Sequence, residues 1–282
     1  MTAITWEVGD AARDPRYVRD MTAIASPAGI GLLLRDWRAR RRLSQMELAL
    51  EASVSARHLS FVETGRSRPS RELVLELAER LDVPLRERNA LLLAAGYAPA
   101  YAQRPLADEA MAPVRDALER LLKGHEPFPA LAVDRQWELV AANEPALALM
   151  SGVAPDLLEP PVNTLRVCLH PDGLAPRIVN LADYSAHLLQ LVAHEAAATG
   201  DPALTTLHEE LSGYPGVVDD VPAHNPATSL FIPLRLRTEA GDLSFFSTIA
   251  RFGTALDVTV AELSVESLFP ADEPTAAFLR GR

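Results

Sequence analysis

Arginines gather in one short stretch of this 282-residue chain. Between Gly29 and Arg71 there are nine arginines and four acidic residues, which gives a local charge of +5. The whole chain carries a formal net charge of -11, so the other residues carry -16. Guanidinium groups bind phosphate oxygens and make paired hydrogen bonds to guanine. The charge distribution suits a DNA-binding segment whose acidic remainder stays off the phosphates, and the alternative on charge alone is a solvated Arg-rich helix.

Catalytic motifs are missing from the sequence. It contains no G-x-S-x-G, Walker, G-x-G-x-x-G or H-E-x-x-H pattern. His187 and His194 are seven residues apart, too far along a helix to share one metal ion without a third ligand from elsewhere. Cys168 is the only cysteine, which excludes an internal disulfide and a multi-cysteine metal site. We expect neither an enzyme nor a bound metal or cofactor.

The composition predicts a cytoplasmic protein. Hydrophobic residues make up 48% of the chain, enough for at least one core, but no apolar run reaches the roughly 20 residues that span a bilayer. Residues 1–20 mix charges with Trp6 and Tyr17 and lack the apolar segment of a signal peptide. We therefore expect no membrane partner.

The Arg-rich stretch carries start and stop signals for five short helices, which must position its side chains. After a first helix, Ser44 begins the second, and Glu47 three residues later completes a capping box. Ser55 begins a third helix that ends at Gly65, and Ser70 begins a fourth. A fifth follows directly, so the sequence predicts a compact all-α bundle.

Three strings within this bundle resemble the phage-repressor (XRE, Cro/C1-type) helix-turn-helix family. They are LSQMELA at 43–49, VS at 54–55 and ETGRSRP at 63–69. The resemblance spans about 65 residues with the correct internal spacing, and we set the domain at 29–97. It implies a transcription regulator whose second motif helix enters the major groove of double-stranded DNA.

That geometry selects the residues that read bases and those that hold phosphates. The N-terminal residues of the recognition helix face the base edges: Ser55, Ala56, Arg57 and Ser60. Phosphate contacts are expected from Arg38, Arg66 and Arg68, while the resemblance gives Gln45 a phosphate-anchoring role and Glu63 a structural one. Arg57 is the one base reader able to make a bidentate contact to guanine. The alternative is a bundle that binds protein rather than DNA.

The remainder of the chain has mixed helix and strand patterns. Residues 98–110 are rich in proline and small side chains and are predicted to form a linker. The expected order thereafter is a helix, two strands, a block of helices and three antiparallel strands. The expected segments are helix 111–123, strands 128–134 and 137–142, mainly helical 163–211, and strands 229–238, 241–251 and 258–269.

This order is that of a PAS-like domain, and two strings resemble the ligand-binding domain of MmyB-type regulators. The strings are FPALAVDRQWELVAANEPALALM and RLRTEAGDLSFFSTIARFGTALDVTVAEL. The resemblance covers about 111–270 and implies sensing of a small apolar ligand such as a fatty acid. The fold class is thus α+β, an all-α five-helix bundle followed by a PAS-like α/β domain with an antiparallel sheet. Residues 1–28 are left as an N-terminal arm and 271–282 as a C-terminal tail.

A ligand cavity would be lined by inward-facing apolar residues of the expected strands. These are Leu131, Val133, Trp137, Leu139, Leu234, Phe245 and Phe246. The same residues could instead fill a solid core, since every sheet needs apolar residues at strand spacing. In that case the domain would be a ligand-free module for protein interaction. We also expect a homodimer on a palindromic operator, because relatives read paired half-sites.

Overall fold

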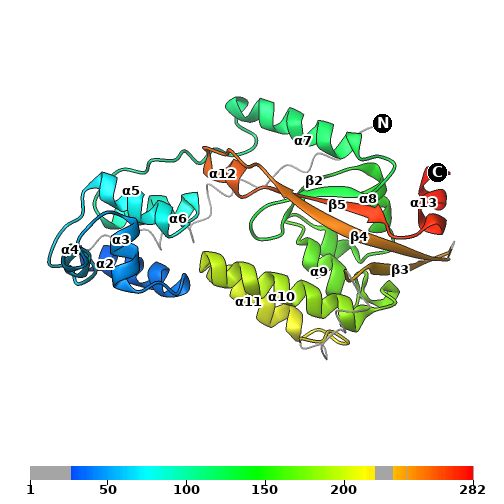
Figure 1. Ribbon diagram of the computed structural model, residues 1–282. Helices are drawn as coiled ribbons and strands as arrows, with labels where there is room; N and C mark the ends of the chain where they lie inside the picture. Colours follow the sequence, from blue (N-terminus) through cyan, green and yellow to red (C-terminus); the bar gives the residue numbers. More distant parts are fainter. Residues whose placement is uncertain (1–26, 220–230, 240, 282) are drawn as a thin grey trace.

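The computed structural model describes residues 27–219, 231–239 and 241–281. A helical bundle and a sheet-containing domain lie side by side (Figure 1). The expected fold class is confirmed: an N-terminal all-α bundle precedes a domain with an antiparallel sheet. The expected arm lies almost entirely outside the described residues.

Five helices form the bundle, as predicted. They are α2 (Pro27–Arg40), α3 (Gln45–Glu51), α4 (Ala56–Glu63), α5 (Arg71–Arg80) and α6 (Leu85–Ala94). The capping box at Ser44 is present, with Ser44 accepting from the Glu47 amide and Glu47 accepting from the Ser44 amide. Ser55 and Ser70 also cap their helices. Because each helix start is fixed by a short polar side chain, the sequence signals placed these elements well.

One core holds the bundle together, and every helix contributes to it. Leu34, Leu48, Leu59, Leu77 and Leu91 are almost completely buried. The turn between α3 and α4 passes through Ser53, whose φ of 54° lies in the left-handed region. This tight turn sets the angle between α3 and α4. Ser53 itself is exposed.

Fifteen elements follow the bundle within the described residues. They are η2 (Glu109–Met111), α7 (Ala112–Gly124), β1 (Ala130–Val133), β2 (Leu139–Ala142), α8 (Glu144–Leu149), η3 (Pro155–Leu158), α9 (Thr164–Leu169), η4 (Ala175–Arg177), α10 (Leu181–Thr199), α11 (Pro202–Ser212), β3 (Leu234–Thr238), β4 (Gly241–Arg251), α12 (Val258–Ala261), β5 (Ser264–Pro270) and α13 (Glu273–Arg280). The five strands form one antiparallel sheet in the order β2-β1-β5-β4-β3.

Both faces of the sheet are covered. Helices α8 to α11 pack on one face against Leu131, Leu234 and Leu268 (Figure 1). Helices α7 and α12 pack on the other against Ala132 and Val265. Strand β1 is therefore buried along its whole length.

Four of the five expected strands begin later than predicted. Trp137 lies in the β1–β2 turn with a φ of 64°, because the Asp134 carboxylate accepts hydrogen bonds from the amides of Gln136 and Glu138. Residues 258–261 form the short helix α12, since Asp257 caps it through the Thr259 amide, and β5 starts at Ser264. The expected strand 229–238 is a strand from Leu234, and its first two residues lie outside the described residues.

The expected tail and linker are also more ordered than predicted. Helix α13 lies within 271–282 and buries Leu279 in the main core, and the Thr275 hydroxyl accepts from the Ser244 amide. In the linker, Leu106 is buried and Arg104 pairs with Asp257 at 3.0 Å. Apolar and ionic contacts thus tie both segments to the sheet domain.

Candidate DNA-binding face and ligand cavity

Helix α4 presents a polar face to solvent. Its buried side carries Leu59 and Val62, which have no exposed surface. Among the four expected base readers, Ser55, Ala56 and Arg57 are exposed and Ser60 is half-buried. The structure therefore brings these residues together on one accessible face, as a recognition helix requires.

Arg57 is held in place by an aromatic ring. Its guanidinium carbon lies 5.3 Å from the centre of the Phe61 ring, one turn further along α4. Stacking on a ring leaves the N–H groups at the guanidinium edge free to donate. Sequence reasoning missed this contact, although the i, i+4 spacing of the two residues is its signal.

Glu63 fixes the geometry of the bundle and engages two of the expected phosphate ligands. Arg38 donates to its two carboxylate oxygens at 2.7 and 2.9 Å and to the Leu43 carbonyl at 2.9 Å. The Gln45 side chain donates to the same carboxylate at 3.0 Å. Hydrogen bonding to Glu63 raises the pKa of Arg38. Arg38 therefore has a structural role, because each guanidinium nitrogen already donates within the bundle, and its phosphate contact stays a prediction.

Arg68 and Arg66 differ in whether their guanidinium groups have partners within the bundle. Arg68 donates to the carbonyls of Ala95 and Gly96 and lies over the Tyr97 ring, which fastens the end of α6. These contacts give Arg68 a structural role, and its phosphate contact stays a prediction. Arg66 is exposed, and among the described residues its guanidinium has no hydrogen-bond or ion-pair partner. Arg66 remains the phosphate ligand that this geometry favours.

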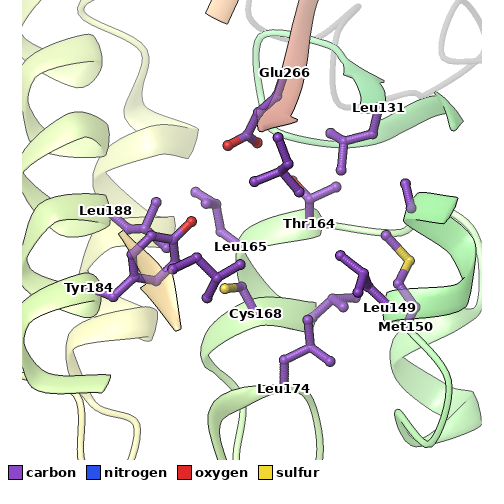
Figure 2. Close-up of a pocket in the computed structure, with 14 residues that line it drawn as sticks. Leu131, Leu149, Met150, Thr164, Leu165, Cys168, Leu174, Tyr184, Leu188 and Glu266 are labelled. Atoms are coloured by element: carbon purple, nitrogen blue, oxygen red, sulfur yellow. The ribbon is translucent and has the colours of Figure 1, made fainter. Parts of the chain in front are cut away.

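A small cavity lies between the sheet and helices α8, α9 and α10 (Figure 2). Its volume is about 70 Å³. It is lined by Leu131, Ala146, Leu149, Met150, Thr164, Leu165, Val167, Cys168, Leu174, Tyr184, Leu188, Leu234, Glu266 and Leu268. The lining is mostly aliphatic, which is typical of a site for an apolar molecule.

Three ionisable side chains interrupt that aliphatic lining. Burial raises the pKa of the Glu266 carboxyl, and it raises the pKa of the Cys168 thiol to about 12. The pKa of Tyr184 is raised well above its usual value by burial and by the nearby Cys168 and Glu266. The thiol is therefore unreactive at neutral pH, while the carboxyl and the phenol give the cavity a polar end.

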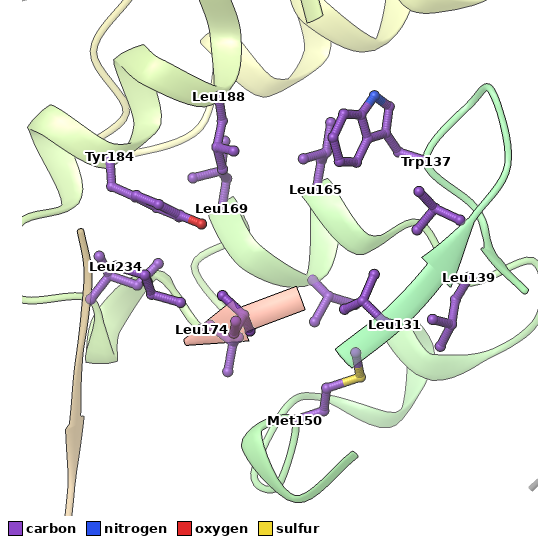
Figure 3. Close-up of a cluster of buried hydrophobic side chains, with 14 of the residues drawn as sticks. Leu131, Trp137, Leu139, Met150, Leu165, Leu169, Leu174, Tyr184, Leu188 and Leu234 are labelled. Carbon is purple, nitrogen blue, oxygen red and sulfur yellow. The ribbon is translucent and has the colours of Figure 1, made fainter. Parts of the chain in front are cut away.

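The expected cavity residues separate into three groups. Leu131 and Leu234 line the cavity. The core beside it contains four others, Val133, Trp137, Leu139 and Phe245. Figure 3 shows Trp137 and Leu139 among these buried side chains. Phe246 is corrected: its ring stacks on Phe269 at 5.2 Å, outside this core, because successive residues of β4 point to opposite faces of the sheet.

Sequence reasoning missed the polar end of the cavity. Strand β5 places Ser264, Glu266 and Leu268 on one face, so Glu266 interrupts a face that meets Leu131 of β1 across the sheet. Alternation along SVESLF was the available signal. Tyr184 comes from α10, in the helical block for which no pocket residue was predicted.

Comparison with family models decides the family. The model described as MmyB-like transcription regulator ligand binding domain matches residues 114–281, and a helix-turn-helix domain model matches residues 30–91. The chain belongs to the MmyB-like transcription regulator family. With its helix-turn-helix domain it is a DNA-binding transcription regulator, and the matched families are regulator types rather than enzymes.

Two solved structures show limited similarity to this MmyB-like regulator. The clp gene regulator ClgR from Corynebacterium glutamicum is 28% identical over 36% of this chain and 94% of that chain, with a TM-score of 0.22. An RNA-binding Light-Oxygen-Voltage receptor is 14% identical over 96% of this chain and 66% of that one, with a TM-score of 0.25. No curated protein matches the chain. The family assignment therefore rests on the two domain models.

Helix α10 of the MmyB-like domain runs from the cavity to the helix-turn-helix bundle. Tyr184 and Leu188 in its N-terminal half line the cavity. At its C-terminal end the carbonyls of Ala197 and Ala198 accept from Arg40 and Arg41 of the bundle, at 3.3 and 3.5 Å. Cations at a helix C-terminus also interact favourably with the helix dipole. One rigid element of roughly 28 Å thus touches both sites.

A second contact between the two domains is ionic and partly buried. Arg86 of α6 pairs with Glu262 through two hydrogen bonds, at 2.7 and 2.6 Å. Arg135 of the β1–β2 turn lies 3.5 Å from Glu87 of α6 and 2.9 Å from Asp201. Polar interfaces of this kind permit relative motion of domains more readily than large apolar ones.

Metal and membrane sites are not indicated in the described part of the chain. Over 27–219, 231–239 and 241–281, no three His, Cys, Asp or Glu side chains gather closely enough to bind a metal ion. No helix within those ranges is both long and apolar enough to cross a membrane.

Proposed function

We propose that this regulator reads a specific DNA sequence with α4 and that its MmyB-like domain senses a small, mainly apolar ligand. Ser55, Ala56, Arg57 and Ser60 contact the bases in this proposal, and Arg66 and Gln45 contact phosphates. The support is the exposure of Ser55, Ala56, Arg57 and Arg66 and the local excess of arginine. The proposed location of this regulator is the cytoplasm, together with the DNA that it binds.

The single observation that carries the sensing role is the reach of α10. Ligand contact with Tyr184 or Leu188 acts on the same helix whose last carbonyls hold Arg40 and Arg41. A shift of α10 along its axis alters the position of α2, against which α4 packs. A ligand that binds one position of α10 more tightly than the other therefore changes DNA affinity. The size of the change is limited by the difference between its two binding free energies.

The cavity volume limits the size of the ligand. About 70 Å³ is well below the 300–1,000 Å³ of drug-sized sites. A long fatty acid does not fit this arrangement, so the proposed ligand is smaller.

Two copies are proposed to bind together. One α4 offers few base contacts, and paired half-sites about 34 Å apart double that number in a two-fold dimer. Sedimentation of the protein with and without a palindromic site measures this directly, and a single copy per palindrome contradicts it.

The test of sensing uses full-length protein and DNA selected by it from a random pool. Small molecules are extracted from the purified protein, identified by mass spectrometry and added back to protein that has been stripped and refolded. The proposal expects the added molecule to change DNA affinity, measured by fluorescence anisotropy. An empty extract and an unchanged affinity would instead support a ligand-free module for protein interaction.

Two glycines provide a matched pair for the coupling step. Gly200 and Gly152 both have positive φ, 74° and 84°. A Cβ at Gly200 would meet Arg40 Cζ at 2.8 Å, whereas one at Gly152 meets nothing within 4 Å. Gly200→Ala is expected to abolish the ligand effect on DNA affinity, and Gly152→Ala to retain it despite similar backbone strain. Equal ligand effects in both variants contradict coupling through α10.

A further inference from the structure

The polar end of the cavity has unused hydrogen-bonding capacity. Glu266 faces the cavity from β5 and accepts a hydrogen bond from Ser247. Tyr184 faces the same space from α10, and Figure 2 shows the two polar groups directed toward one another across it. The Tyr184 hydroxyl makes no hydrogen bond to a described residue, and its oxygen is not among the fully enclosed polar atoms that lack a partner. The Thr164 hydroxyl is already used, because it donates to the Trp137 carbonyl at 3.1 Å.

Glu266 and Tyr184 offer a ligand different hydrogen-bonding groups. An ionised carboxylate only accepts hydrogen bonds, whereas a phenol donates one and also accepts. A ligand hydroxyl donates to the carboxylate and accepts from the phenol. A ligand carboxylate or ammonium group would have to give up its hydration in a mostly aliphatic cavity, whereas a hydroxyl is neutral and can both donate and accept.

We propose that the cavity binds a small alcohol whose hydroxyl donates to Glu266 and accepts from Tyr184. This inference rests on the sensing role proposed above and names the ligand class of that site. The alkyl part of the alcohol lies against Leu131, Leu165 and Leu188.

The volume sets the length of the alcohol. A water molecule takes about 30 Å³ in the liquid, and a 150 Å³ engineered cavity holds benzene. About 70 Å³ therefore suits an alcohol of a few carbon atoms. Met150 lines the same space with a flexible side chain, so modest lengthening of the chain is tolerated.

A matched trio of fluorinated probes tests the proposal on the full chain. The probes are 3-fluoropropanol, 3-fluoropropionate and 3-fluoropropylamine, and binding is followed by broadening of the ¹⁹F signal at neutral pH. The alcohol is expected to bind at least about tenfold more tightly than either charged probe, since desolvation of a charged group in an apolar cavity costs more than that factor. Unlabelled 1-propanol must displace it.

Two variants and one control locate the site. Glu266→Gln is expected to reduce the preference for alcohol over carboxylate by about tenfold, and Tyr184→Phe to weaken alcohol binding about threefold to tenfold. Glu209→Gln, an exposed substitution on α11, is expected to bind like the wild type. Thermal unfolding of each protein shows whether it is folded. Tyr184→Phe keeps the test valid if the Glu266 variant fails to fold.

The outcomes separate this inference from the sensing role. Preference for the carboxylate, or alcohol binding unchanged in both variants, overturns the hydroxyl assignment and leaves the sensing role standing. Failure of all three probes to bind also overturns it. The sensing role fails only if, in addition, the extracted molecules leave DNA affinity unchanged.

Discussion

Each of the two domains has a glutamate packed among its elements, and the two glutamates differ in how many hydrogen bonds they accept. In the bundle, Glu63 is 9% exposed, and it accepts two hydrogen bonds from Arg38 and a third from Gln45. In the MmyB-like domain, Glu266 borders a cavity and accepts from the single hydroxyl of Ser247. A fully paired buried carboxylate holds elements in position, whereas one with free acceptor positions favours binding of a further molecule.

The same contrast separates the arginines of the bundle. Arg38 and Arg68 donate to carboxylate or carbonyl oxygens of the bundle, whereas Arg57 and Arg66 are exposed and donate to no described residue. Local positive charge alone therefore does not show which arginines already have partners within the protein. The partners of each guanidinium decide its role.

The largest effect on stability is expected when the ion pair between Arg38 and Glu63 is removed. Arg38→Ala leaves this carboxylate buried without its cation, which should lower the free energy of unfolding by about 3–5 kcal/mol. Arg66→Ala, on the exposed side, should stay within about 0.5 kcal/mol of the wild type. Urea denaturation measures both. If the two variants are equally stable, the structural assignment of Arg38 is wrong.

A smaller effect is expected for the ion pair between the domains. Arg86 and Glu262 keep 20% and 17% of their side-chain surface exposed, against 49% and 40% for the Arg80–Glu76 pair. A double-mutant cycle to alanine should give a coupling energy of about 1–2 kcal/mol for the first pair and below about 0.5 kcal/mol for the second. Equal values would show that the domain contact contributes no more than a surface pair.

Glu266 predicts a pH effect with a definite sign. Burial raises its pKa in the folded protein, so between the ordinary pKa and the raised one the folded state holds more protons than the unfolded state. Stability contributed by the neutral carboxyl is present below the ordinary pKa and is lost as the pH rises through the raised value. Glu266→Gln removes this loss.

Thermal unfolding across pH tests that sign. Glu266→Gln should be more stable than the wild type at pH 7, and the difference should vanish near pH 4. Glu87 and Asp134, whose pKa values burial also raises, are present in both proteins and cancel in the difference. The predicted sign is wrong if the stability of Glu266→Gln relative to the wild type is lower at pH 7 than at pH 4.

The smallest predicted change concerns salt dependence. Arg66→Ala removes one phosphate contact and should lower the slope of log affinity against log salt by about one, equally for all DNA sequences. Arg68→Ala serves as the comparison, because its guanidinium holds α6 and is expected to leave the slope unchanged. A sequence-dependent loss with Arg66→Ala would place this residue on a base.

The sequence predicted the bundle more completely than the cavity, for a physical reason. Serine caps and glycine stops act within four residues, so Ser44, Ser55 and Ser70 were found from local spacing. The cavity is formed by segments far apart in the chain, and only Leu131 and Leu234 of the expected set line it. Tertiary contacts, such as Arg38 with Glu63 across 25 residues, have no local signal.

The central claim is that α4 reads DNA sequence through Arg57. Selection of binding sites from a random DNA pool by the full-length wild-type protein and by Arg57→Ala tests it most directly. The account predicts a two-fold symmetric motif for the wild type, with a guanine in each half-site. For Arg57→Ala it predicts a loss of that guanine preference by about 1–3 kcal/mol, while the rest of the motif remains. An identical motif from both proteins, or no motif from the wild type, would contradict it.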